Sequence, residues 1–97
     1  MRTMLKFTVP VERSNQAIKD GSLKKTLESL LARLKPEAAY FAPLGGKRGG
    51  MIFFDMAEPS NIVEICEILF LNLDAEVEFV PVMSADDLAK GLANSGL

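Results

Sequence analysis

The stretch MIFFDM, residues 51–56, restricts the fold of this chain most, because it reads as a β-strand that is apolar on both faces. Successive side chains of a strand point to opposite faces of the sheet. One face carries Ile52, Phe54 and Met56, and the other carries Met51, Phe53 and Asp55. Since neither face suits water, a sheet built around this strand needs a cover on both sides.

Strand and helix patterns follow one another in the order β-α-β-β-α-β over 97 residues, a length that fits one domain spanning residues 1–97. The predicted strands are residues 3–9, 37–44, 51–57 and 75–83. The predicted helices are residues 11–35 in two pieces, one after Ser60, and a short closing helix after Ser84. This order predicts an α+β, ferredoxin-like fold with an antiparallel sheet.

The first helical segment carries its own break and stop signals. Its second half has leucines at helical spacing: Leu23, Leu27, Leu30, Leu31 and Leu34. Ile18 lies off this stripe, so we expect a break at Asp20 and Gly21. Pro36 is expected to end the helix, because it restricts the residue before it.

The next helix is expected to begin with Ser60 as its N-cap. Its predicted buried stripe is Ile62, Ile65, Cys66, Leu69, Phe70 and Leu73. Ile68 and Leu71 lie off that stripe and are expected to meet the tail or another chain. Ser84, three residues before Asp87, predicts a capping box for the closing helix.

Two prolines support this topology. The ferredoxin-like order puts the second and fourth strands at the edges of the sheet, and these strands contain Pro43 and Pro81. Proline lacks the N–H group that a central strand must donate, so it suits an edge strand. The first and third strands contain no internal proline.

The first strand shows the same two-sided pattern as the third. Leu5, Phe7 and Val9 share one face, and Met4, Lys6 and Thr8 share the other. Two helices can cover only one face of a four-stranded sheet, so the second face needs a ligand or another sheet. We therefore expect a homodimer with its sheets face to face, which is a dimeric α/β barrel.

Composition excludes several classes of partner. The net charge of −2 provides no field for nucleic acid or an anionic membrane, so neither is an expected partner. No apolar stretch approaches the roughly 20 residues that span a bilayer, and the N-terminus lacks a signal-peptide core, so we expect a cytoplasmic protein. With no His and one Cys, His-ligated metal, haem and thiolate-cluster sites are excluded, and no cofactor is expected.

Residues 45–50, GGKRGG, fit either a phosphate-binding nest or a turn between two strands. Walker and dinucleotide loops precede a helix, whereas an apolar strand follows here, so we interpret the stretch as a hairpin turn. Arg48 could still reach a ligand at the mouth of a barrel. The region superficially resembles an RNA-binding motif, but Gly50, Met51 and Ile52 stand where its aromatic platform is required.

The polar residues of the predicted strands are candidates for one cavity: Lys6, Thr8, Tyr40, Asp55 and Glu78. Together with Arg48 they are the candidate ligand-binding residues. A buried carboxylate can act as a general base, and an ammonium group can stabilise an oxyanion. Asp55, Tyr40 and Lys6 are therefore the candidate catalytic residues.

These polar residues also have a structural interpretation. Lys6 could pair with a carboxylate inside a dimer interface, or Glu76 and Glu78 could lie on a solvated edge. Spacing along the chain does not show whether the groups converge. Cys66 has no His to activate it, so we expect an inert core cysteine.

Three stretches, NQAIKDG (15–21), KPEAAYF (35–41) and PVMSADDL (81–88), resemble a group of small uncharacterised bacterial proteins in the dimeric α/β-barrel superfamily. The resemblance covers nearly the whole chain. Muconolactone isomerase and the antibiotic-biosynthesis monooxygenases are similar to this group in fold only, and no catalytic motif of theirs transfers residue by residue. The resemblance implies a face-to-face dimer that encloses a barrel, and it leaves the function open.

The first functional expectation is a small dimeric α/β-barrel protein that binds a small, largely apolar molecule between its sheets. One alternative is a cofactor-independent isomerase or monooxygenase acting on a small phenolic or lactone-like compound. Another is a protein-interaction subunit that docks through Ile68 and Leu71.

Overall fold

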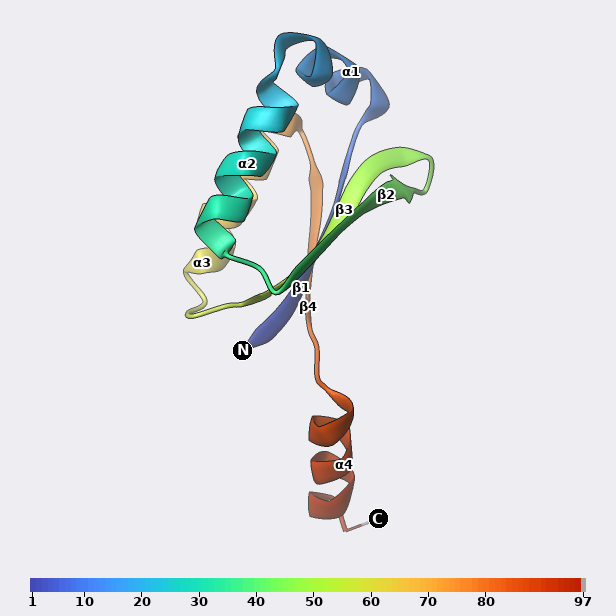
Figure 1. Cartoon of the computed structure of the whole chain (residues 1–97), viewed down its shortest axis with the longest axis vertical. Coiled ribbons are helices and arrows are strands. Elements are labelled where there is room, and N and C mark those ends of the chain that lie inside the picture. The colour runs from blue at the N-terminus through green and yellow to red at the C-terminus, as the bar shows by residue number, and fades with distance from the viewer. Residues whose placement is uncertain (97) are drawn as a thin grey trace.

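The computed structural model describes residues 1–96 and confirms the ferredoxin-like prediction (Figure 1). Its elements are β1 (Arg2–Val9), α1 (Val11–Asp20), α2 (Ser22–Leu34), β2 (Ala38–Leu44), β3 (Lys47–Asp55), α3 (Asn61–Leu73), β4 (Glu76–Pro81) and α4 (Ala85–Asn94). The strands form one antiparallel sheet in the order β2-β3-β1-β4. Pro43 and Pro81 therefore lie on the two edge strands, as predicted.

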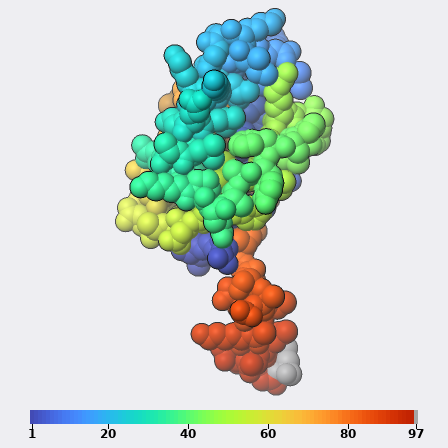
Figure 2. Space-filling view, in the orientation of Figure 1, coloured from blue at the N-terminus to red at the C-terminus, as the bar shows by residue number. Residues whose placement is uncertain are grey.

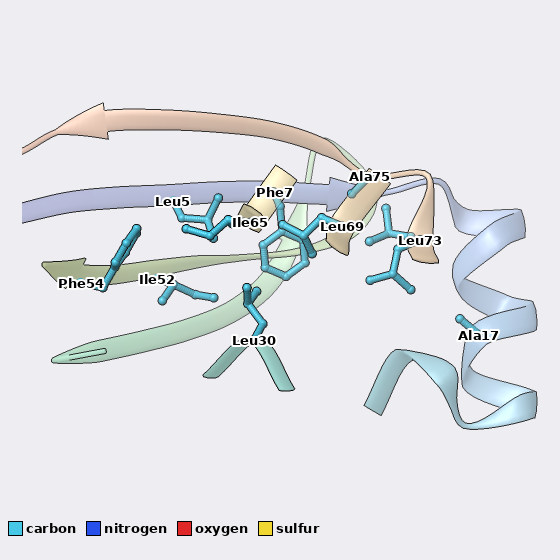
Figure 3. Close-up of a cluster of buried hydrophobic side chains, with 11 residues drawn as sticks. Leu5, Phe7, Ala17, Leu30, Ile52, Phe54, Ile65, Leu69, Leu73 and Ala75 are labelled. Carbon is cyan, nitrogen blue, oxygen red and sulfur yellow. The ribbon is translucent and has the colours of Figure 1, made fainter. Parts of the chain in front are cut away.

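The hydrophobic core lies between the sheet and the helices on one of its faces (Figure 3). Alternate residues of β1 and β3 supply the sheet side: Leu5, Phe7, Val9, Ile52 and Phe54. The helices supply Ala17, Leu30, Ile65, Leu69 and Leu73. All ten are at most 2% exposed, and burying each large side chain contributes about 1.5–3 kcal/mol.

The break between α1 and α2 falls at Asp20 and Gly21, as predicted. Gly21 has φ 81°, a left-handed conformation that glycine adopts without a Cβ clash, and this ends α1. The Asp20 carboxylate accepts a hydrogen bond from the backbone N–H of Ser22 at 2.8 Å. The neighbouring Ser22, through its hydroxyl and its backbone N–H, lowers the pKa of the Asp20 carboxyl.

The β2–β3 hairpin is tighter than the sequence pattern indicated. β3 begins at Lys47 instead of residue 51, and Lys47 is paired with Leu44. The turn therefore consists of Gly45 and Gly46 alone, with φ values of 60° and 81°. Positive φ at both central residues is the pattern of a type I′ turn, whose twist matches the flanking strands. The hairpin interpretation is confirmed, and the predicted start of the strand is corrected.

The second glycine pair of this stretch lies inside β3 and is required by packing. A Cβ at Gly49 would lie 2.4 Å from the backbone oxygen of Phe7 on the neighbouring strand. A Cβ at Gly50 would lie 2.7 Å from Cδ1 of Phe41. These two glycines let the β1 backbone and the Phe41 ring approach β3 closely.

Ser60 occupies the N-cap position of α3, as predicted, but the expected capping contact and the buried stripe differ from prediction. Ser60 does not cap the helix with its side chain, because its hydroxyl donates to the Glu58 carboxylate at 2.6 Å. The buried residues of the helix are Ile65, Leu69 and Leu73. Ile62 and Phe70 are 39% and 42% exposed, and Cys66 is half-buried. The helix meets the core along one line of i, i+4 residues, so the flanks of the predicted stripe stay outside.

The C-terminal segment forms a helix, but the prediction that it closes on the domain is wrong. α4 projects clear of the rest of the molecule, and none of its residues is buried (Figures 1 and 2). Leu88 and Leu92, one turn apart, are 52% and 54% exposed. The predicted capping box is present, with Ser84 and Asp87 exchanging two hydrogen bonds of 3.1 Å. A cap determines where a helix begins, and leaves open where the helix packs.

The capping box makes the order of α4 dependent on pH. The pKa of the Asp87 carboxyl lies below its ordinary value of 3.8, chiefly because the carboxylate accepts a hydrogen bond from the backbone N–H of Ser84. Because this folded-state pKa is lowered, the stabilisation is present above pH 3.8 and is lost as the pH falls through the folded value. We expect helical ¹³Cα shifts of α4 to decrease over that acidic range, and Asp87→Ala to decrease them at pH 7.

Asp86→Ala is the matched control for the cap, because Asp86 lies in the same first turn without belonging to the box. Equal fraying in both variants would assign the effect to the helix dipole instead of the capping hydrogen bonds.

Candidate functional site on the open sheet face

We call the face of the sheet that is turned away from the helices the open face, and the strand register arranges its side chains in rows. The rows are Tyr40–Met51–Lys6–Glu78, Ala38–Phe53–Met4–Val80 and Ala42–Gly49–Thr8–Glu76. The second row is apolar throughout, and the other two contain polar residues. Met4, Met51 and Phe53 are half-buried although the helices pack on the opposite face.

A hollow of about 310 Å³ lies on this face, where β1 and β4 meet the β2–β3 turn. Three of the predicted residues, Lys6, Thr8 and Glu78, line it together. Glu76 and Lys47 complete its polar lining. The convergence of Lys6, Thr8 and Glu78 follows from the register, which pairs Lys6 with Glu78 and Thr8 with Glu76 across β1 and β4.

The charges of this hollow are only partly paired. Glu76 accepts a 3.5 Å hydrogen bond from Thr8 Oγ1 and lies 3.5 Å from Lys47 Nζ. Within the described residues, neither the Lys6 ammonium nor the Glu78 carboxylate has an ion pair within 4.0 Å. One ammonium and one carboxylate on adjacent strands are therefore available to a ligand or to another chain.

The remaining candidates on the open face lie further away. Asp55 lies four residues along β3 from Met51, the partner of Lys6, which is about 13 Å of extended strand. Its carboxylate binds the N-terminal amine of Met1 at 2.8 Å. Tyr40 shares a row with Lys6 but stands two strands away, and its side chain is 60% exposed. Within one copy, the candidate catalytic residues Asp55, Tyr40 and Lys6 do not form one group.

Arg48 lies on the other side of the sheet. Its Nη1 donates to Ser14 Oγ at 2.7 Å and to Asn15 Oδ1 at 2.8 Å, and both acceptors belong to α1 on the helix side. The sequence pattern placed Arg48 in the turn, from which it could reach a ligand at the mouth of a barrel. With a two-residue turn, Arg48 becomes the second residue of β3, and strand alternation directs it away from Lys47.

Sequence reasoning did not select Lys47 as a site residue, and it considered Glu76 only as part of a solvated edge. A signal for Lys47 was available in the Gly45–Gly46 pair. Had the turn been limited to these two glycines, alternation along β3 would have put Lys47 on the same face as Met51 and Phe53.

Other chemistry receives little support from the described residues. Burial raises the pKa of the Cys66 thiol, and the neighbouring Glu67 carboxylate adds to the effect, so the thiolate nucleophile is disfavoured. Among residues 1–96, no three Cys, Asp or Glu side chains gather to hold a metal ion. No helix in the same range is long and apolar enough to cross a bilayer.

Comparisons with known proteins give a likeness in fold and no match to a family or a curated sequence. No protein-family model matches the chain, and no curated protein matches its sequence. Among solved structures, the chain is similar to the de novo designed protein Ferredog-Diesel, with 12% sequence identity and a TM-score of 0.49. That match covers 84% of this chain and 85% of the designed one. None of these comparisons tests the resemblance to dimeric α/β-barrel proteins, and the ferredoxin-like assignment rests on the order of the elements and of the strands in this chain.

Proposed function

We propose that this chain forms a homodimer, in which two sheets pack open face against open face and hold a small molecule between them. The observation that carries the proposal is the apolar row Ala38, Phe53, Met4 and Val80 on a face that no helix covers. Removing apolar surface from water contributes about 25 cal/mol per Å². A second sheet is the cover that fits this flat surface of strands.

The chain exposes more surface than a compact monomer of its mass, which supports a second copy as the cover of the open face. Folded monomers of this mass expose about 5,500 Å². This chain exposes 6324 Å². The excess, about 800 Å², is close to what one partner buries in a stable interface of standard size. Part of the excess comes from α4, whose projection gives a radius of gyration of 15.5 Å where about 12.5 Å is usual for this length.

The charges of the open face also suit a copy of the same chain. A two-fold interface brings the same patch together twice, so a face that carries both signs can complement itself. Lys6 and Glu78 are adjacent and opposite in charge, and neither forms an ion pair within the described structure. In the dimer, Lys6 of each copy pairs with Glu78 of the other or with the ligand.

The ligand that suits the enclosed space has an apolar body and one polar group. Phe53, Met4 and Met51 supply apolar contacts, and the hollow beside them supplies Lys6, Thr8 and Glu78. The isomerase or monooxygenase alternative needs a general base close to Lys6. Because Asp55, the base that this alternative names, lies at the far end of β3 from Lys6, the geometry does not support the catalytic group of Asp55, Tyr40 and Lys6.

The proposal is tested by native mass spectrometry of the purified protein at micromolar concentration. We expect a species of twice the chain mass, and any retained ligand will appear as additional mass per dimer. A monomer throughout the micromolar range would overturn the proposed dimer and its enclosed site.

Removal of α4 tests its contribution to the same dimer. In the proposed assembly, Leu88 and Leu92 of each α4 pack on the other copy, because no residue of α4 is buried within its own chain. A chain that ends at Ser84 is therefore expected to dimerise at least about tenfold more weakly, because the apolar burial of Leu88 and Leu92 is lost from both copies. Unchanged dimerisation would show that α4 lies outside the interface.

A further inference from the structure

A second hollow, of about 340 Å³, lies on the helix side of the sheet, between α2 and the β2–β3 hairpin. Figure 2 shows this side of the molecule, with α2 in cyan and the hairpin in green. The lining includes Phe7, Val9, Leu23, Leu27, Phe41 and Arg48. We call this hollow the hairpin groove. Its lining is apolar except for Arg48, and no acidic residue belongs to it.

One wall of the hairpin groove is an aromatic ring that remains open to solvent. Phe41 packs edge-on against Phe7, with ring centroids 6.5 Å apart, yet it is 50% exposed. The Phe41 ring packs closely over Gly50, in space that a side chain at position 50 would occupy. A large aromatic side chain fixed in this way offers an apolar surface that requires little ordering when a ligand binds.

The charge at the edge of the groove has no counter-ion in the described chain. The three other arginines, Arg2, Arg13 and Arg33, each lie within 4.0 Å of a carboxylate, and Arg48 does not. Arg48 instead donates from Nη1 to two neutral oxygens, those of Ser14 and Asn15. Ser14 is fully buried, so this anchor is rigid. The guanidinium is therefore held in position with N–H donors left for an anion.

From this combination we infer that the hairpin groove binds a small monocarboxylate with an apolar body. The carboxylate pairs with Arg48, and the body lies against Phe41, Leu23 and Leu27. A neutral apolar molecule would gain nothing from the exposed Arg48 guanidinium. A dianion would bring a second charge into an apolar space. This site is independent of the proposed dimer, because it lies on the opposite face of the sheet.

Titration of the ¹⁵N-labelled protein with sodium octanoate, and separately with 1-octanol, tests the inference by NMR. We expect octanoate to shift the resonances of Leu23, Leu27, Phe41 and the Arg48 side chain, and to bind about tenfold or more tightly than octanol. Hexanoate should bind more weakly than octanoate, by about fourfold for each methylene removed.

Arg48→Gln should remove the preference for the acid and leave the binding of octanol unchanged, which shows that the groove is still formed. Arg33→Gln is the matched control, because Arg33 is an exposed arginine of α2 outside the groove, and it should retain the preference. Octanoate that binds Arg48→Gln as tightly as the parent, or that shifts only residues of the open face, would overturn the inference.

Discussion

The Phe53→Lys variant is expected to run as a monomer at concentrations at which we expect the parent protein to dimerise. Phe53 is the largest side chain of the apolar row and stands between Ala38 and Met4 on the open face. A buried aromatic residue at the centre of an interface is worth about 2 kcal/mol or more, and a two-fold interface contains it twice. The dissociation constant should therefore rise about a thousandfold or more.

Analytical ultracentrifugation across a concentration series measures this change, and circular dichroism checks that the variant is folded. Phe53 points away from the core cluster, so the fold of one copy should survive. Leu71→Lys is the control, since Leu71 is 76% exposed on α3, on the far side of the sheet. If Leu71→Lys dissociates the dimer and Phe53→Lys does not, the interface lies on the helix layer and the proposed open-face dimer is wrong.

The Gly49→Ala variant is expected to lose a large part of the stability of the fold. The added Cβ would stand 2.4 Å from the backbone oxygen of Phe7, and 3.2 Å from side-chain atoms of Leu44 and Thr8. β1 and β3 are the two central strands, so the backbone of β1 cannot withdraw without disturbing the sheet. We expect a loss of about 3 kcal/mol, from a total that is typically about 5–15 kcal/mol.

Urea denaturation measures that loss, and Gly91→Ala provides the control. A Cβ at Gly91 meets no atom within 4 Å, and the residue lies inside α4, where alanine is favoured over glycine by up to about 1 kcal/mol. Gly91→Ala should therefore leave the midpoint unchanged or raise it slightly. An unchanged midpoint for Gly49→Ala would mean that β1 and β3 can separate at this position.

The features that could be read from the amino-acid pattern are those with a local cause. The break at Asp20 and Gly21, the capping box of Ser84 and Asp87, and the edge position of the two proline-containing strands depend on neighbouring residues or on one backbone donor. The two-sided apolar pattern of residues 51–56 is equally local, because side chains alternate along any strand.

The composition of the sites depended on register, which a local pattern specifies poorly. A shift of one residue moves every side chain of a strand to the other face. The two-residue turn at Gly45 and Gly46 directs Lys47 to the open face and Arg48 to the helix side. Pairing across β1 and β4 then brings Lys6 beside Glu78, whereas Asp55 is left at the far end of β3.

The sequence of this chain is therefore sufficient to predict the order of its strands and helices, the main breaks and caps of its helices, and a sheet with apolar residues on both faces. It is not sufficient to predict which polar groups meet, which face receives Arg48, or that α4 stands away from the domain. The face of Arg48 follows from the length of the β2–β3 turn. The pairing of Lys6 with Glu78 and the position of α4 depend on contacts between residues far apart in the chain.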